Sequence, residues 1–252
     1  DCRPPLAGGD QSDLLQADDA KFDGLYPCCG WTAISFSRAS DTSEGKKEFI
    51  DVAASTLVPL EDSTMRHVSA TLDYLIEHCQ DVAEDKLVEF RPERLPVTWS
   101  TFTAVDDGGI CLQTYDHQGR AVTVRNRVAI VEAKRGISSV VEGKPVVSDA
   151  WLAQMTCQAI GAKMGRDGQE LEKINDVIVI AVAQTFWSFL QFKMTVKYIE
   201  KLDNPAAVNQ AVDEPYLHVD ATDWFDMGNK EGRTNVLKNI SALINGLVKE
   251  LG

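Results

Sequence analysis

The sequence lacks a long apolar run. A membrane-spanning helix needs roughly 18–20 consecutive apolar residues, and the most apolar stretch, residues 177–183, has only seven. We therefore expect no membrane-spanning segment. We favour an intracellular protein in the nucleus or cytoplasm, with a secreted effector as the alternative.

The sequence also lacks the spacings that mark several common kinds of site. Its six cysteines are scattered, with only Cys28 and Cys29 adjacent, and this is the pattern neither of a zinc site nor of a small disulfide framework. It has no glycine-rich phosphate loop, nucleophile elbow or zinc signature. These absences argue against a P-loop nucleotide hydrolase, an α/β-hydrolase and a zinc enzyme.

Basic residues are few overall, with 25 Lys and Arg against 38 Asp and Glu and a net charge of −13. Such a balance argues against an indiscriminate nucleic-acid binder, because phosphate contacts need Lys and Arg. The charge is uneven, however. The segment from Arg120 to Arg166 has eight basic and three acidic residues, so its net charge is +5 while the rest of the chain has −18. Any nucleic-acid partner is expected to bind this segment, notably at Arg125, Arg127, Arg135 and Lys163.

The composition predicts two parts. Residues 1–42 are acidic and rich in Gly, Asp and Ser, which indicates a partly irregular extension. Residues 43–252 are predicted to form a single domain. Apolar residues at spacings of three and four predict helices over residues 62–79, 149–164 and 231–251, and a short helix is expected over residues 43–57.

Strand-like runs lie between the first two long helices. Residues 97–105, 110–115 and 121–134 are separated by the turn sequences Asp106–Gly109 and "DHQGR", which predicts an antiparallel meander of three strands. The continuous apolar run within residues 175–184 predicts a further strand covered on both faces. The expected order of helix, three strands, helix and strand indicates a mixed α/β domain with a central sheet.

The strand "NRVAIVEAKRG" has an unusual end. Side chains alternate along a strand, so one face is expected to carry Val128, Ile130, Glu132 and Lys134, and the other Ala129, Val131 and Ala133. Two opposite charges at the end of a buried strand are costly unless each has a partner. Mg²⁺ or Mn²⁺ is such a partner for Glu132, and Lys134 can orient a water molecule or stabilise a phosphate. The alternative is that both side chains leave the sheet at its rim and face water, since Glu-x-Lys is a common tripeptide.

This strand, the preceding "DDGG" turn and the following helix and apolar strand resemble the PD-(D/E)XK nuclease superfamily, and in particular fungal proteins with such a domain. The resemblance covers roughly residues 62–183 in the order of elements, and in detail only the Glu-x-Lys strand. It implies a metal-dependent nuclease in which Glu132 binds the metal and Lys134 is the motif's lysine. The second acid of the motif is Asp107 or Asp106; we prefer Asp107, which is nearer the next strand.

Two further sets of polar residues are candidates by the same resemblance. Gln154 and Gln158 are four residues apart and share a helix face; related nucleases place a glutamine near the active site, whereas hydrogen bonding within the helix is the alternative. Glu77 and Asp73 lie on the first helix, where the resemblance implies a glutamate, but neither lies on the apolar stripe of that helix.

The sequence thus supports two hypotheses of different kinds. The first is an Mg²⁺- or Mn²⁺-dependent nuclease that cleaves DNA or RNA, with Asp107 and Glu132 as metal ligands and with Lys134 and Gln154 as catalytic residues. The second is a PD-(D/E)XK-type fold that has lost catalysis and serves as a binding or effector module.

Overall fold

The structure, a computed structural model, describes residues 32–33, 61–80, 86–99, 102–137, 139–141, 144–164, 176–195, 198–199, 202 and 217–250. Most of the predicted extension and the predicted short helix over residues 43–57 lie outside these ranges. Thr32–Ala33, within the predicted extension, form strand β1 and pair with β11 of the central sheet. No helix in the described ranges is long and apolar enough to cross a bilayer.

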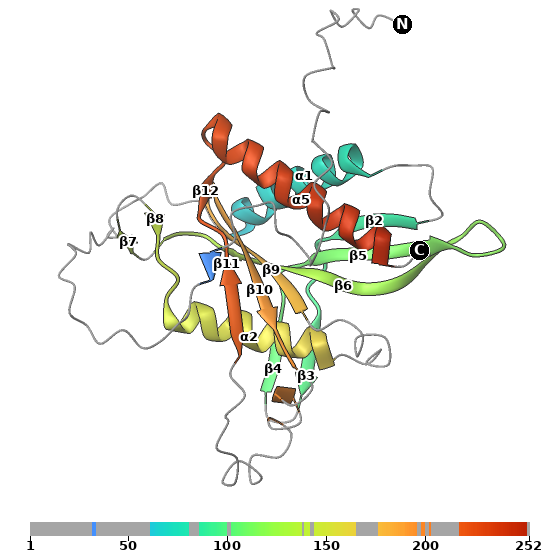
Figure 1. The fold of residues 1–252 in the computed structure, drawn as a ribbon, viewed down its shortest axis with the longest axis horizontal. Coiled ribbons are helices and arrows are strands. Elements are labelled where there is room, and N and C mark those ends of the chain that lie inside the picture. Colours follow the sequence, from blue (N-terminus) through green and yellow to red (C-terminus); the bar gives the residue numbers. More distant parts are fainter. Residues whose placement is uncertain are drawn as a thin grey trace, which may run out of the picture.

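The central sheet has the strand order β1-β11-β10-β9-β6-β5-β2, with β12 beside β10. The pair β6 and β9 is parallel, and all other pairs are antiparallel, so the sheet is mixed. The described part of the chain is therefore a mixed α/β protein, as predicted (Figure 1). The strands not yet given bounds are β2 (Lys86–Arg91), β5 (Gly109–Tyr115), β6 (Ala121–Lys134), β9 (Asp176–Ala183), β10 (Phe186–Lys193), β11 (His218–Ala221) and β12 (Phe225–Asp226).

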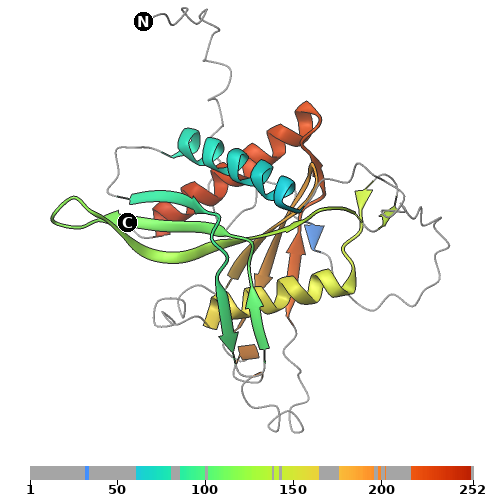
Figure 2. The same ribbon diagram turned by 180° about the vertical axis from the view of Figure 1, so that it is seen from behind.

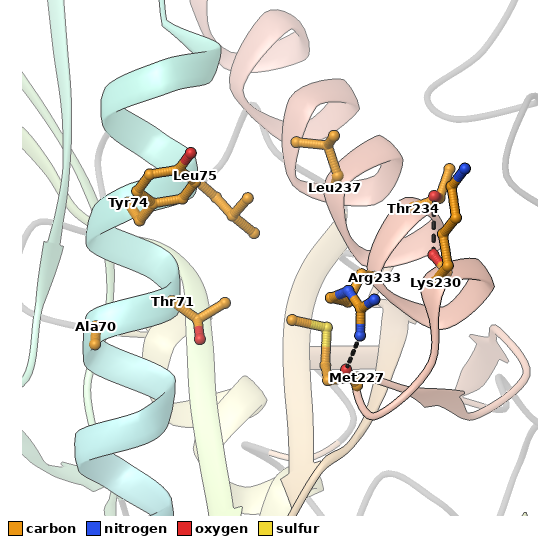
Figure 3. Close-up of a pocket in the computed structure, with 9 residues that line it drawn as sticks. All are labelled: Ala70, Thr71, Tyr74, Leu75, Met227, Lys230, Arg233, Thr234 and Leu237. Atoms are coloured by element: carbon orange, nitrogen blue, oxygen red, sulfur yellow. Dashed lines mark hydrogen bonds between the residues drawn. The ribbon is translucent and has the colours of Figure 1, made fainter. Parts of the chain in front are cut away.

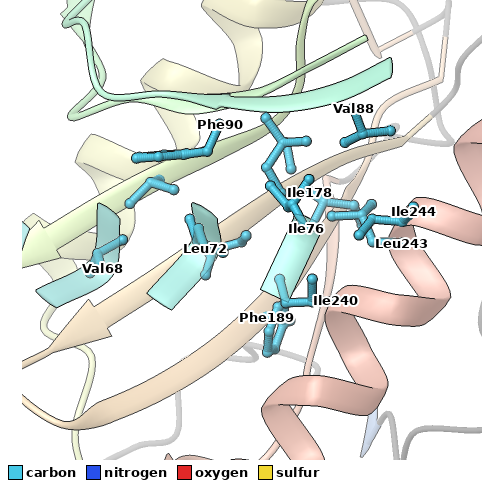
Figure 4. Close-up of a cluster of buried hydrophobic side chains, with 14 of the residues drawn as sticks. Val68, Leu72, Ile76, Val88, Phe90, Ile178, Phe189, Ile240, Leu243 and Ile244 are labelled. Atoms are coloured by element: carbon cyan, nitrogen blue, oxygen red, sulfur yellow. The ribbon is translucent and has the colours of Figure 1, made fainter. Parts of the chain in front are cut away.

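Helices α1 (Glu61–Cys79) and α5 (Lys230–Glu250) cover one face of the sheet. Each has an apolar stripe at helical spacing, and burying these stripes removes much apolar surface from water. The resulting cluster includes Phe189 of β10 and joins both helices to β2, β5, β6, β9 and β10 (Figure 4). The helical members are Val68, Leu72, Ile76, Val236, Ile240, Leu243, Ile244 and Leu247.

Helix α2 (Asp149–Met164) covers the opposite face, so the described helices lie on both sides of the sheet (Figure 2). Its Trp151, Met155, Ala159 and Ile160 pack against β6, β9, β10 and β11 in a second apolar cluster. Strand β9 contributes to both clusters and is almost completely buried. This confirms the prediction of a strand covered on both faces.

The predicted three-strand meander is only partly correct. Residues 97–105 do not supply the first strand of the sheet; they contribute to a separate hairpin of β3 (Pro96–Trp99) and β4 (Phe102–Val105), which contacts α2. The neighbour of β5 is instead β2, which the sequence analysis missed. Its signal is weak, because only Val88 and Phe90 of its six residues are buried and the others include charged side chains at the sheet edge. A further short hairpin consists of β7 (Val140–Val141) and β8 (Lys144–Pro145).

Candidate active site

The end of β6 places Glu132 and Lys134 on the face of the sheet that α2 covers. Ala129 and Val131 belong to the cluster under α1 and α5, whereas Ile130 belongs to the cluster under α2. The predicted alternation therefore holds over these residues. Val128 departs from it and packs with the α1 and α5 cluster, next to the irregular pairing of β5 with β6.

Glu132 is completely buried and has two polar partners. Its Oε1 faces the Lys134 Nζ at 2.5 Å, an ion pair without regular hydrogen-bond geometry. Its Oε2 accepts a hydrogen bond of 2.5 Å from Gln158 Nε2 on α2. The rim alternative for Glu132 is therefore wrong, because its carboxylate lies inside the protein and not in water.

Helix α2 supplies a glutamine to each charged group of this pair. Gln154 Oε1 accepts a hydrogen bond of 2.8 Å from Lys134 Nζ, so Lys134 bridges Glu132 and Gln154. Gln158 Nε2 also donates to Val105 O at 2.8 Å. The spacing of four residues brings both amides to the end of β6, as the helix periodicity predicts.

Asp107 reaches the same place from the segment before β5. Its backbone N donates to Val131 O at 3.1 Å, and its Oδ2 accepts a hydrogen bond of 3.0 Å from Ala133 N. Its Oδ1 lies 3.0 Å from Arg94 Nη2. Since Ala133 directly follows Glu132, Asp107 lies beside Glu132, and its charge acts on that carboxyl group.

Glycine is required directly after Asp107. Gly108 has φ +139°, a conformation that other residues rarely adopt, and an added Cβ would lie 2.7 Å from Arg91 O. The "DDGG" segment was predicted to join two neighbouring strands of the central sheet, but the strand before it, β4, lies outside that sheet. The segment leads from the β3–β4 hairpin into the central sheet and lets the backbone next to Asp107 approach β2 closely.

Asp106, the other candidate for the second acid, has a different partner. Its carboxylate binds Arg127 Nε at 2.8 Å, and both side chains are buried, with exposed fractions of 6% and 7%. Its Oδ1 also accepts a hydrogen bond of 3.0 Å from Leu95 N. Asp106 is therefore part of a buried ion pair that fastens the segment before β3, and Asp107 is the acid beside Glu132.

Burial raises the pKa of the Glu132 carboxyl group above its ordinary value of 4.5. The ion pair with Lys134 and the hydrogen bond from Gln158 oppose this effect, whereas the negative charge of Asp107 adds to it. The folded protein therefore disfavours the charged carboxylate relative to the unfolded chain. This is the environment in which an added cation would be favourable.

The raised pKa predicts a dependence of stability on pH. Above pH 4.5 the folded protein binds more protons at Glu132 than the unfolded chain does, so the free energy of unfolding should fall as the pH rises through the folded pKa. Glu132→Gln removes this contribution. Urea unfolding of both proteins from pH 4.5 upward should show the wild type losing stability relative to the mutant. A constant difference would contradict the raised pKa.

The donors near Glu132 suit a magnesium-like ion better than a zinc ion. In the described ranges no group of three or more His, Cys, Asp or Glu side chains is arranged to hold a metal. Mg²⁺, however, usually takes only one or two carboxylates and keeps several waters, and Asp107 and Glu132 are two such carboxylates. Gln158 Oε1 is a buried acceptor without a hydrogen-bond partner in the described structure, which is unusual for a buried polar atom. In type, carboxylate and amide oxygens are the ligands that Mg²⁺ and Mn²⁺ prefer.

The remaining predicted residues are not brought to this site. Glu77 and Asp73 are exposed on α1, which covers the opposite face of the sheet. Arg127, Lys163 and Arg135 were expected to contact nucleic acid, which stays a prediction. The Arg127 side chain is 7% exposed and is held by Asp106, Lys163 is buried, and Arg135 is exposed. The side chain of Arg125 lies outside the described part.

A groove elsewhere in the molecule is separate from this site. It lies between α1 and α5, has a volume of about 420 Å³ and is lined by two basic residues and no acidic one (Figure 3). Tyr74 lines the groove and has an exposed fraction of 60%. The groove is on the opposite face of the sheet from Glu132. Its lining residues are Ala70, Thr71, Tyr74, Leu75, Met227, Lys230, Arg233, Thr234 and Leu237.

Comparison of the chain with protein-family models, with curated proteins and with solved structures gave no significant match. The resemblance to PD-(D/E)XK nucleases therefore stays a prediction. The functional assignment below depends on the geometry around Glu132.

Proposed function

We propose that the protein is a PD-(D/E)XK-like, metal-dependent nuclease that hydrolyses phosphodiester bonds of DNA or RNA. The observation that carries the proposal is the group of Asp107, Glu132 and Lys134 at one end of the sheet, with Glu132 completely buried and Gln154 on Lys134. A buried carboxyl group with a raised pKa beside an ammonium group, as at Glu132, marks a candidate functional site.

The order of elements gives further support. Helix α1 is followed by β2, β5 and β6, which are antiparallel neighbours, then by α2 and by β9, which is parallel to β6. This is the sequence of helix, three strands, helix and strand that the resemblance implies, with the β3–β4 and β7–β8 hairpins inserted. The proposed second motif, just before β5, is hydrogen-bonded to the proposed third motif at the end of β6.

Each residue of the site has a role in the proposed reaction. Asp107 and Glu132 would hold Mg²⁺ or Mn²⁺, which when bound supplies a Lewis acid for a phosphoryl oxygen. Lys134, held by Gln154, would orient the attacking water or donate to a phosphate oxygen. Attack of water on phosphorus breaks the bond to the leaving oxygen. The alcohol and the phosphomonoester are the products.

The second candidate is a catalytically inactive module for binding or effector function. One observation favours it, namely that both carboxylates already have a cationic partner in the protein. Asp107 binds Arg94, and Glu132 binds Lys134. If these ion pairs are only structural, the site needs no metal.

Cleavage assays distinguish the two candidates. Purified protein should cut at least one of single- or double-stranded DNA or RNA with Mn²⁺ and not with EDTA. Lys134→Ala should reduce the rate by roughly 10²-fold or more, the usual effect of removing one group that stabilises developing charge. If Mn²⁺ produces no cleavage of any of these substrates, the inactive module is favoured.

The basic segment predicts where nucleic acid binds. Arg135, directly after β6, and Lys144, the first residue of β8, are exposed basic residues of this segment, and Lys144 forms an exposed ion pair with Asp223. Reversing both charges, in Arg135→Glu with Lys144→Glu, should weaken oligonucleotide binding by about tenfold or more and reduce its dependence on salt.

The matched control is Lys238→Glu, which reverses an exposed charge on α5, on the opposite face of the sheet. Fluorescence anisotropy at several salt concentrations measures both effects. An equal loss with Lys238→Glu would show that the basic segment is not the contact surface.

A further inference from the structure

The loop between β2 and β3 holds an arginine against the candidate site. Arg94 lies in this loop, and its Nη2 is 3.0 Å from Asp107 Oδ1. Its side chain remains 55% exposed, so the guanidinium also faces solvent at the edge of the site. Sequence analysis did not identify Arg94, which lies outside the segment from Arg120 to Arg166.

The buried Arg127–Asp106 pair fixes the loop on both sides of Arg94. Arg127 Nη2 donates to Glu93 O at 2.6 Å, and Asp106 Oδ1 accepts from Leu95 N at 3.0 Å. The backbone immediately before and after Arg94 is therefore tied to a buried ion pair. The position of the arginine beside Asp107 is thus set by the fold, whereas 55% of its side-chain surface is exposed.

The charges in the site form a row. Arg94 lies on Asp107, Asp107 lies beside Glu132, and Glu132 binds Lys134. Two cationic side chains therefore flank two carboxylates. Asp107 Oδ2 is already used by Ala133 N, so Oδ1 is the oxygen left for a metal, and Arg94 occupies it.

We propose that Arg94 is a phosphate-binding residue of the site and competes with the divalent cation for Asp107. The inference rests on the proposed function and extends it to the way in which the substrate is held. Asp107 is almost buried and Arg94 is 55% exposed. A cation that takes the place of the guanidinium on Asp107 leaves no unpaired buried charge, so the exchange is compensated. A cation on Oδ1 repels Arg94, and an anionic phosphodiester attracts it.

Arginine suits this role better than lysine. Its planar guanidinium donates two parallel hydrogen bonds to phosphate oxygens, whereas an ammonium acts as a point charge. A phosphate seated between Arg94 and Lys134 would be bound from two sides, above the carboxylates that hold the metal. The implied substrate is a phosphodiester whose negatively charged phosphate can reach Arg94 and Lys134 at the edge of the site.

The test compares Arg94→Ala and Arg94→Lys with the wild type and with Arg233→Ala, which removes an exposed arginine from α5 on the opposite face. The first readout is the Mn²⁺ concentration that gives half of the metal-dependent rise in melting temperature. The second is the separation of KM from kcat for an oligonucleotide that the wild type cleaves. Melting without metal checks that each variant is folded.

Arg94→Ala should bind Mn²⁺ at about tenfold lower concentration and raise KM about tenfold or more, because a competitor and a charged hydrogen-bond donor are lost together. Arg94→Lys should show a smaller change in the Mn²⁺ midpoint and a raised KM. Arg233→Ala should match the wild type in both. If the wild type is active and Arg94→Ala leaves both the Mn²⁺ midpoint and KM unchanged, the proposed role of Arg94 is overturned. The proposed function of the protein is not affected by that result.

Failure of the proposed function gives a different result. In that case the wild type neither cleaves nor shows a metal-dependent rise in melting temperature. If Arg94→Ala then gains a metal-dependent rise, the competition for Asp107 is supported although the wild type is inactive. If it gains none, both the proposed function and the role of Arg94 are overturned.

Discussion

Glu132→Gln is expected to abolish the metal-dependent activity and the metal-dependent stabilisation together. Loss of a carboxylate ligand removes the charge stabilisation that a bound cation supplies, which is several kcal/mol, so cleavage should fall roughly 10³-fold or more. A native-state ligand at a hundredfold excess over its Kd stabilises a protein by about 2.7 kcal/mol. The rise in melting temperature of the wild type with Mn²⁺ should therefore disappear in the mutant.

Without metal, the same mutant should be as stable as the wild type or more stable. Burial raises the pKa of Glu132, so its charge opposes folding near neutral pH, and a neutral side chain of the same shape relieves this cost. The matched control is Glu89→Gln, a half-exposed carboxylate on β2 that pairs with Arg91. It should retain both cleavage and the metal shift. A wild type without a metal shift, together with a mutant destabilised by roughly 1–3 kcal/mol, would favour the inactive module.

Asp106→Asn and Asp107→Asn should have opposite effects although the two residues are adjacent. Asp106→Asn leaves the buried guanidinium of Arg127 without its counter-ion, which typically costs about 3–5 kcal/mol of folding stability. Asp107→Asn removes the charge of a carboxylate whose ion-pair partner Arg94 is 55% exposed and stays hydrated, so it should destabilise the protein less than Asp106→Asn. It should nevertheless lower both the affinity for Mn²⁺ and the cleavage rate. Expressed as a fold-change, the loss of affinity should be at least as large as the loss of rate.

Thermal melting of both variants with and without Mn²⁺ separates the two roles. Asp106→Asn should melt at a much lower temperature and retain the rise with Mn²⁺, whereas Asp107→Asn should melt close to the wild type and lose the rise. The reverse pattern would assign the second acid to Asp106 and contradict the geometry of the site.

The placement of the polar side chains at the end of β6 could be predicted, because it depends on residues that are close in the sequence. Alternation along one strand is enough to put Glu132 and Lys134 on a common face, and the spacing of Gln154 and Gln158 is enough to put them on a common helix face. Which strand faces which helix is a tertiary property, and in the fold the two faces meet so that all four polar side chains contact one another in pairs.

The sequence favoured Asp107 over Asp106 only because Asp107 is nearer the next strand, and it did not show what partner each acid has. The partner of Asp106 is Arg127, which is 21 residues from Asp106 in the chain and lies within 2.8 Å of it in the fold. The positive net charge of the segment from Arg120 to Arg166 suggested that Arg127 is exposed. A net charge does not show which basic residues have buried partners. Arg94 was missed for the same reason, since only the folded loop brings it to Asp107.

The strand at the edge of the sheet, next to β5, was predicted wrongly. The sequence has two candidate segments for this position, residues 97–105 and β2. Residues 97–105 are rich in Thr, Trp, Phe and Val and were favoured on strand propensity. In the fold they contribute to a hairpin on α2, while the more polar β2 occupies the edge and buries only Val88 and Phe90. An edge strand needs little apolar surface, so propensity alone selects the wrong segment.

The most direct test of a metal site at Asp107 and Glu132 is the anomalous difference map of a crystal soaked in Mn²⁺. The account predicts one peak within coordination distance of Asp107 Oδ1 and a carboxylate oxygen of Glu132, with Arg94 displaced from Asp107. No peak at saturating Mn²⁺, with the Arg94–Asp107 and Lys134–Glu132 ion pairs both intact, would contradict it.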